Sequence, residues 1–124
     1  MSAEMIHVLL TLRNQIKVYH WQTRKHSRHI ATDGLTAKLD ELVDAFVESY
    51  MGKYGRPKFT AKTGVIHLGN FTESNAHHLL EEGIHYLTTH MTKKLDPRKD
   101  TDLLNLRDEI IGELNKVRYL FTLE

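Results

Sequence analysis

A chain of 124 residues is long enough to bury one hydrophobic core and too short for two. With 40% hydrophobic and 27% charged residues it has the composition of a globular domain, and it has no apolar run of the length that crosses a bilayer. The net charge of +1 gives little electrostatic reason to expect nucleic-acid binding, and the lack of cysteine excludes disulfides, thiolate metal sites and cysteine nucleophiles.

Apolar residues recur at helical spacing over residues 5–24 and predict the first helix. The positions that it would bury are Met5, Val8, Leu9, Leu12, Ile16 and Tyr19. A second helix is expected over residues 29–54, where the same period continues. Its core positions are Leu35, Leu39, Leu42, Phe46 and Tyr50. Gly52, Gly55 and Pro57 end this helix, because the residue before a proline is pushed out of the α region.

Residues 55–70 contain glycine and proline without a helical period, and only residues 64–68 show a trace of strand-like alternation. Asn70 followed by Glu73 predicts a helix start with Asn70 as its cap. This third helix would run to about Lys94. Its core positions are Ala76, Leu80, Ile84, Leu87 and Met91. A fourth helix is expected over residues 97–123. It would bury Leu103, Leu106, Ile110, Leu114, Val117 and Phe121.

The lengths of the connections determine the expected topology. The first and last joints are short, which predicts two antiparallel helix pairs. The link over residues 55–70 has about 16 residues and can reach roughly 50 Å when it is extended. A helix of about 22 residues is only about 33 Å long. The link can therefore cross the whole length of the bundle. We expect one all-α domain over residues 1–124, a four-helix bundle with a long crossover.

The candidate chemistry lies in histidines and carboxylates. The chain has 9 histidines, an unusually large number, and histidine is the commonest metal ligand. On the second predicted helix, Asp44 and Glu48 point almost diametrically away from the apolar stripe. His29 and Asp33 lie one turn apart near the start of that helix, and His20 lies near the end of the first. Nitrogen and oxygen ligands without sulfur suit iron, manganese or zinc. A solvated acidic face is the plainer interpretation and stays open.

Three motifs follow one another in this half of the chain: His20-Trp21, His29-x3-Asp33 and Asp44-x3-Glu48. Their order resembles the ferroxidase signature of the Dps proteins, or miniferritins. In that family a histidine–tryptophan pair on the first helix precedes a histidine-x3-aspartate and an aspartate-x3-glutamate on the second. The resemblance covers roughly residues 5–54. It departs from the family in the interval between His20 and His29, which is about three residues shorter than in Dps proteins. This interval lies at a turn, where a deletion disturbs the structure least.

The resemblance implies a ferritin-like bundle with up-down-down-up helix order and a metal site shared by two subunits. One subunit would supply His20, His29 and Asp33, and its two-fold partner would supply Asp44 and Glu48. The implied function is oxidation of Fe(II) by peroxide or dioxygen at an inter-subunit di-iron site, with iron storage and protection from peroxide. Trp21 would be catalytic as an electron donor to stray oxidants, with aromatic packing at the helix end as the alternative.

The resemblance also implies a homo-oligomer, at least a two-fold dimer and in the family a dodecameric shell. The short chain leaves a dimer or a shell of another size open. Two stretches are similar to a group of uncharacterised proteins of large DNA viruses: Tyr19-His20-Trp21-Gln22-Thr23 and Gly52-Lys53-Tyr54-Gly55-Arg56. The first residues lack the basic start and cleavage site of a signal peptide. We expect a cytoplasmic protein, placed in the virion or the infected-cell cytoplasm if it is viral.

Other functions have weaker support in the sequence. Glu82-x2-His85 has the form found in di-iron bundles, but helical projection turns His78, Glu81 and His85 away from the core and favours a solvated face or an interface. Scattered basic residues without a basic tail argue against DNA binding, and no membrane partner is expected. Two alternatives remain beside the ferroxidase. One is a zinc or manganese module without turnover, and the other is a structural or interaction bundle without catalysis.

Overall fold

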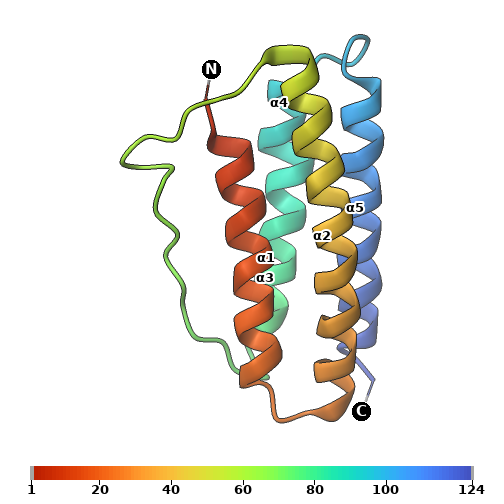
Figure 1. Cartoon of the computed structure of the whole chain (residues 1–124). Helices are drawn as coiled ribbons and strands as arrows, with labels where there is room; N and C mark the ends of the chain where they lie inside the picture. The colour runs from red at the N-terminus through yellow and green to blue at the C-terminus, as the bar shows by residue number, and fades with distance from the viewer. Residues whose placement is uncertain (1, 124) are drawn as a thin grey trace.

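Four helical rods, packed side by side, make up most of residues 2–123, the part of the chain that the computed structural model describes (Figure 1). Three rods are single helices: α1 (Glu4–Gln22), α2 (His26–Tyr54) and α5 (Thr101–Leu120). The remaining rod consists of α3 (Ala76–His85), the π-helical turn η1 (Tyr86–Met91) and α4 (Thr92–Lys94) without interruption. Residues 2–123 contain no β-strand, and residues 64–68 are irregular. The predicted all-α four-helix bundle is confirmed.

The core forms where the apolar stripes of the four rods meet. One leucine from each rod illustrates this: Leu9, Leu39, Leu80 and Leu114 are each at most 1% exposed. Burying a leucine side chain stabilises the fold by about 1.5–3 kcal/mol relative to leaving it in water. The predicted core positions are buried, except that Val8, Ile84 and Leu106 are only half-buried. Helical spacing therefore identified the inward face of every rod.

Three helix starts differ from the sequence expectation. α2 begins at His26 rather than at residue 29, so the α1–α2 turn is only residues 23–25. The expected cap at Asn70 is wrong, because α3 begins at Ala76 and the Asn70 side chain instead accepts a hydrogen bond from Gln22 Nε2 at 2.7 Å. The last helix begins at Thr101 and not at 97. Asp96 holds a turn there by accepting the backbone N–H groups of residues 98 and 99 at 2.8 and 2.9 Å.

The link between α2 and α3 runs along the whole of α1 (Figure 1). At one end, Lys58 pairs with Ser2 in an isolated parallel bridge. At the other end, the backbone N–H of Phe71 donates to Gln22 Oε1 at 3.1 Å. α3 therefore begins at the end of the bundle where α2 begins, and these two helices run in the same direction. The start of α5 contacts the end of α2, because Lys53 Nζ lies 2.6 Å from Asp102 Oδ1, so α5 runs the opposite way.

A buried arginine joins the α1–α2 turn to the end of α5. Arg28, 8% exposed, donates to Tyr19 Oη at 2.9 Å, to the Glu73 carbonyl at 2.8 Å and to the Phe121 carbonyl at 3.3 Å. Its guanidinium carbon also lies 4.5 Å from the centroid of the Phe121 ring. The Glu73 carboxylate accepts hydrogen bonds from the Thr23 and Tyr19 hydroxyls, which hold its pKa below the ordinary value. The turn that precedes His26 is thus fixed by a polar network.

Candidate metal centre

Two stacked imidazoles flank the α1–α2 turn. The rings of His20 at the end of α1 and His29 at the start of α2 have centroids 3.9 Å apart and an interplanar angle of 19°. Each ring bonds the backbone of the other residue: His20 Nδ1 donates to the His29 carbonyl at 2.9 Å, and His29 Nδ1 donates to the His20 carbonyl at 3.0 Å. A ring that donates through Nδ1 keeps the lone pair of Nε2 for a metal. The pair therefore has the tautomers that ligation requires.

Burial keeps the inner histidine neutral. His20 is only 5% exposed, and its Nδ1 also lies 3.0 Å from the Thr32 hydroxyl. Burial, followed by the proximity of His29, lowers the pKa of His20 below its ordinary value. An uncharged imidazole is the form that binds metal, so no proton has to be displaced from this ring at neutral pH. His29 is exposed and makes the pair accessible from solvent.

The three candidate carboxylates are exposed along α2. Asp33 lies one turn after His29, whereas Asp44 and Glu48 lie further along the helix. At the rise of an α-helix, Asp44 is about 22 Å from His29 along the axis. Within residues 2–123, neither a hydrogen bond nor an ion pair is made by Asp33, Asp44 or Glu48. One subunit therefore does not bring the five predicted ligands together.

Trp21 follows His20 but points into solvent. Its side chain is 67% exposed, and Lys17 Nζ lies 5.5 Å from the ring centroid. This exposure leaves little room for the alternative, aromatic packing at the helix end. The indole is open to any small oxidant that reaches the turn.

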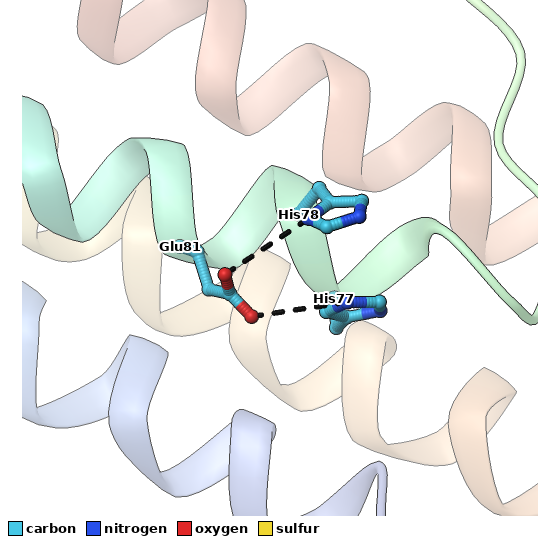
Figure 2. A group of neighbouring side chains, drawn as sticks. All are labelled: His77, His78 and Glu81. Carbon is cyan, nitrogen blue, oxygen red and sulfur yellow. Dashed lines mark ion pairs between the residues drawn. The ribbon is translucent and has the colours of Figure 1, made fainter.

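Another group of ligand-type side chains lies on α3, where the sequence favoured a solvated face. His77, His78 and Glu81 have ligand atoms that all lie within 4.8 Å of one another. Figure 2 shows the three side chains on one side of the helix, with both imidazoles next to the carboxylate. The spacing is a detectable signal, since residues three and four apart are neighbours on a helix. Projection away from the core was predicted correctly, whereas the proximity of the three groups was not.

The π-helical turn η1 arranges further histidines downstream. A π-helix is defined by backbone hydrogen bonds between residues five apart. Just after η1, the Thr92 hydroxyl donates to the Leu87 carbonyl at 3.2 Å. The His90 ring stacks on Tyr86 with centroids 5.5 Å apart and meets the edge of His85 at 5.7 Å. Nothing in the residue pattern predicted this turn. Glu82 and His85 do not join a metal cluster of three within residues 2–123.

The comparisons with known proteins place the chain in a family. A family described as of unknown function, DUF5856, matches residues 20–121. The chain belongs to the DUF5856 family. The DUF5856 match contains all five predicted ligands and the α3 cluster. The family match is to DUF5856 and not to a Dps or ferritin family, so the Dps resemblance is one of motifs over residues 5–54.

One relative of this DUF5856 chain is a phage protein. An uncharacterized 14.6 kDa protein from the mobD–ri intergenic region of Enterobacteria phage T4 is 24% identical over 121 residues, which cover 98% of this chain and 88% of the relative. The phage relative fits the expectation of a viral protein. No solved structure matches the chain. Among residues 2–123, no helix is long and apolar enough to span a membrane.

Proposed function

We propose that this protein is a ferritin-like iron-oxidising bundle whose metal site forms between two subunits. The observation that carries the proposal is the His20–His29 pair, in which both Nδ1 atoms bond the backbone and both Nε2 atoms are left for a metal. Asp33 extends this half-site by one helical turn. The exposed carboxylates of Asp44 and Glu48 lie too far along α2 to join it in one chain, and a two-fold partner would supply them.

The helix directions support the ferritin-like part of the proposal. α2 and α3 run in the same direction, and a link as long as the bundle connects them (Figure 1). The up-down-down-up order that the Dps resemblance implies contains such a parallel pair. It leaves the outer face of α2, with its row of carboxylates, available to another subunit.

The ligand set suits iron as a substrate. Imidazole nitrogens hold Fe(II), and carboxylate oxygens favour the more highly charged Fe(III). Two Fe(II) ions supply the two electrons that, with two protons, reduce one peroxide to two waters. Because both electrons leave together, no hydroxyl radical is released. The exposed indole of Trp21 would intercept an oxidant that takes only one electron.

The test is an anaerobic Fe(II) titration of the metal-free protein, followed by peroxide and an optical record of oxidation. We expect saturable binding of about one to two Fe(II) ions per chain, as in two-metal sites, and rapid oxidation. Glu48→Ala and Asp44→Ala should abolish both while changing the free energy of unfolding by less than about 0.5 kcal/mol. The control is Glu109→Ala, which removes an exposed carboxylate from α5. Equal iron behaviour of Glu48→Ala and the parent contradicts the proposal.

The same experiment separates the remaining functions. Saturable binding without oxidation would indicate a zinc or manganese module built from these ligands. No saturable binding would leave a structural or interaction bundle. The size of the loaded particle decides whether storage accompanies oxidation, since only a closed shell encloses a mineral.

A further inference from the structure

The first turns of α3 carry a ligand group that the proposed iron site does not use. His77 Nε2 lies 3.9 Å from Glu81 Oε1, and His78 Nδ1 lies 3.9 Å from Glu81 Oε2. The centroids of the two imidazole rings are 4.0 Å apart. The three side chains leave the same side of α3, and the carboxylate reaches back toward both rings (Figure 2). The helix thus gathers two nitrogen ligands and one oxygen ligand from within five residues.

The ligand atoms, which all lie within 4.8 Å of one another, are a little further apart than they would be around an ion. Ligand atoms at about 2.0–2.2 Å from a tetrahedral metal lie roughly 3.4 Å from one another. The two imidazole–carboxylate distances of 3.9 Å are too long for hydrogen bonds, so no direct bond has to break when an ion enters. The side chains of His77, His78 and Glu81 are 43%, 59% and 43% exposed and can close by rotation of their own torsions.

The donor set selects a class of ion. Two imidazoles with one carboxylate suit divalent transition-metal ions, Fe²⁺ among them, and the general order of affinity favours Cu²⁺ and Zn²⁺ over Fe²⁺. Mg²⁺ and Ca²⁺ prefer oxygen ligands. Three ligands from one face of one helix cover one side of the ion. The remaining coordination positions open to solvent, as in zinc sites that keep a water.

We propose that His77, His78 and Glu81 form a second metal site, which binds one Zn²⁺ or Cu²⁺ ion per chain through three ligands. The site is complete within a single subunit, in contrast to the proposed iron site. It shares no residue with the iron site and lies on a different rod. Since its outer positions face solvent, the ion exchanges freely with solution and remains open to a fourth ligand.

The test is isothermal titration with Zn²⁺ of metal-free protein that carries both His29→Ala and Glu48→Ala, in which both halves of the proposed iron site are disabled. We expect one Zn²⁺ per chain with micromolar affinity and no binding of Mg²⁺. His77→Ala, His78→Ala and Glu81→Gln should each weaken Zn²⁺ binding at least tenfold. The matched controls are His67→Ala in the link and His90→Ala in η1, which remove exposed histidines outside the group and should leave the affinity unchanged. Far-UV circular dichroism establishes that each variant is folded.

Two results would overturn the second site. One is an equal loss of Zn²⁺ affinity in His67→Ala or His90→Ala, which would mean adventitious binding by scattered histidines. The other is unchanged affinity in Glu81→Gln, which would mean that the carboxylate is not a ligand. Fe(II) oxidation by His77→Ala tests whether the two sites are independent. This variant lacks a ligand of the second site only, so it should oxidise Fe(II) like the parent.

Discussion

Asp100 is a buried carboxylate, 1% exposed, at the residue before α5. Its oxygens accept hydrogen bonds from Tyr54 Oη, from Lys53 Nζ at 3.3 Å and from the Asp96 backbone N–H at 2.7 Å. Burial alone would raise the pKa of Asp100, but the hydrogen bonds from Tyr54, Asp96 and Lys53 outweigh it and lower the pKa. One charge thus connects the end of α2 to the turn before α5.

We expect Asp100→Asn to lower the free energy of unfolding by about 2 kcal/mol at pH 7, because a hydrogen-bonded buried charge is lost. The folded-state pKa is depressed, so the charge stabilises the fold above the unfolded pKa of about 3.9, and this stabilisation is lost as the pH falls through the folded pKa. The difference between parent and variant should therefore shrink below about pH 4. Urea denaturation across the pH range measures it.

Asp108→Asn is the matched control, since Asp108 is an exposed carboxylate on α5 that bonds only its neighbour Arg107 within residues 2–123. Its stability should lie within about 0.5 kcal/mol of the parent at every pH. If the difference in free energy of unfolding between Asp100→Asn and the parent stays constant down to acid pH, the substitution destabilises the fold by altering packing and not by removing a charge.

Between its two ends, the link that joins α2 to α3 is held to α1 by one side-chain amide. Gln15, 5% exposed, donates through Nε2 to the Gly69 carbonyl at 2.7 Å and accepts the Gly69 N–H through Oε1 at 2.7 Å. Both polar groups of one irregular residue are therefore satisfied by α1. This contact keeps the link against the bundle, where it separates the start of α3 from the end of α2 by a full helix length (Figure 1).

Gln15→Glu keeps the shape of the side chain but replaces the donor with an acceptor that faces the Gly69 carbonyl. We expect trypsin to cleave after Lys62, an exposed residue of the link, about ten times faster, because an unpaired buried polar group costs about 1–3 kcal/mol. Gln22→Glu makes the same change at an exposed contact with the link, where water replaces the lost bond, and should alter cleavage little. Equal protection of Gln15→Glu and the parent would show that other contacts hold the link.

The sequence predicts the positions of some helices better than those of others. α1, α2 and α5 were identified by apolar period alone, because each helix buries one continuous stripe. The start of α3 was misplaced, since Asn70 is a good cap by type but its side chain accepts a hydrogen bond from Gln22 at the end of α1. The π-helical turn η1 depends on packing of Leu87 and Met91 into the core and has no local signal. Tertiary contacts decide such positions.

The candidate sites show the same division. Helical geometry predicted the exposed positions of Asp44 and Glu48 and the outward direction of His78 on α3. It did not predict the reciprocal backbone bonds of His20 and His29, which depend on how tightly residues 23–25 turn. Those bonds fix the tautomers, and so the chemistry of the pair is a consequence of the fold.

At the scale of the whole molecule, the proposed iron site requires two chains, and mixing variants tests this. His29→Ala and Glu48→Ala each remove a ligand from a different half of the shared site. A dimer made of two copies of the same variant should therefore be inactive. In a refolded equal mixture about half of the dimers contain both chains, and each of these has one intact site, so about a quarter of the activity should return. Fe(II) oxidation in the mixture measures the recovery.

A mixture of His29→Ala with Asp33→Ala is the control. These residues belong to the same half-site, so no combination of the two chains restores a complete set of ligands. Recovery in this control, or none with Glu48→Ala, would contradict a site shared across a two-fold axis.

The start of α1 and the end of α5 lie at opposite ends of the bundle, which has a practical consequence (Figure 1). The end of α5 lies beside the α1–α2 turn, where the Phe121 and Tyr19 ring centroids are 5.8 Å apart. The start of α1 is about 28 Å away at the helical rise. A purification tag or fluorescent reporter at the carboxyl end would crowd the histidine pair and confuse any metal assay. The same fusion at the amino end leaves that turn clear, and is the arrangement to use for labelling.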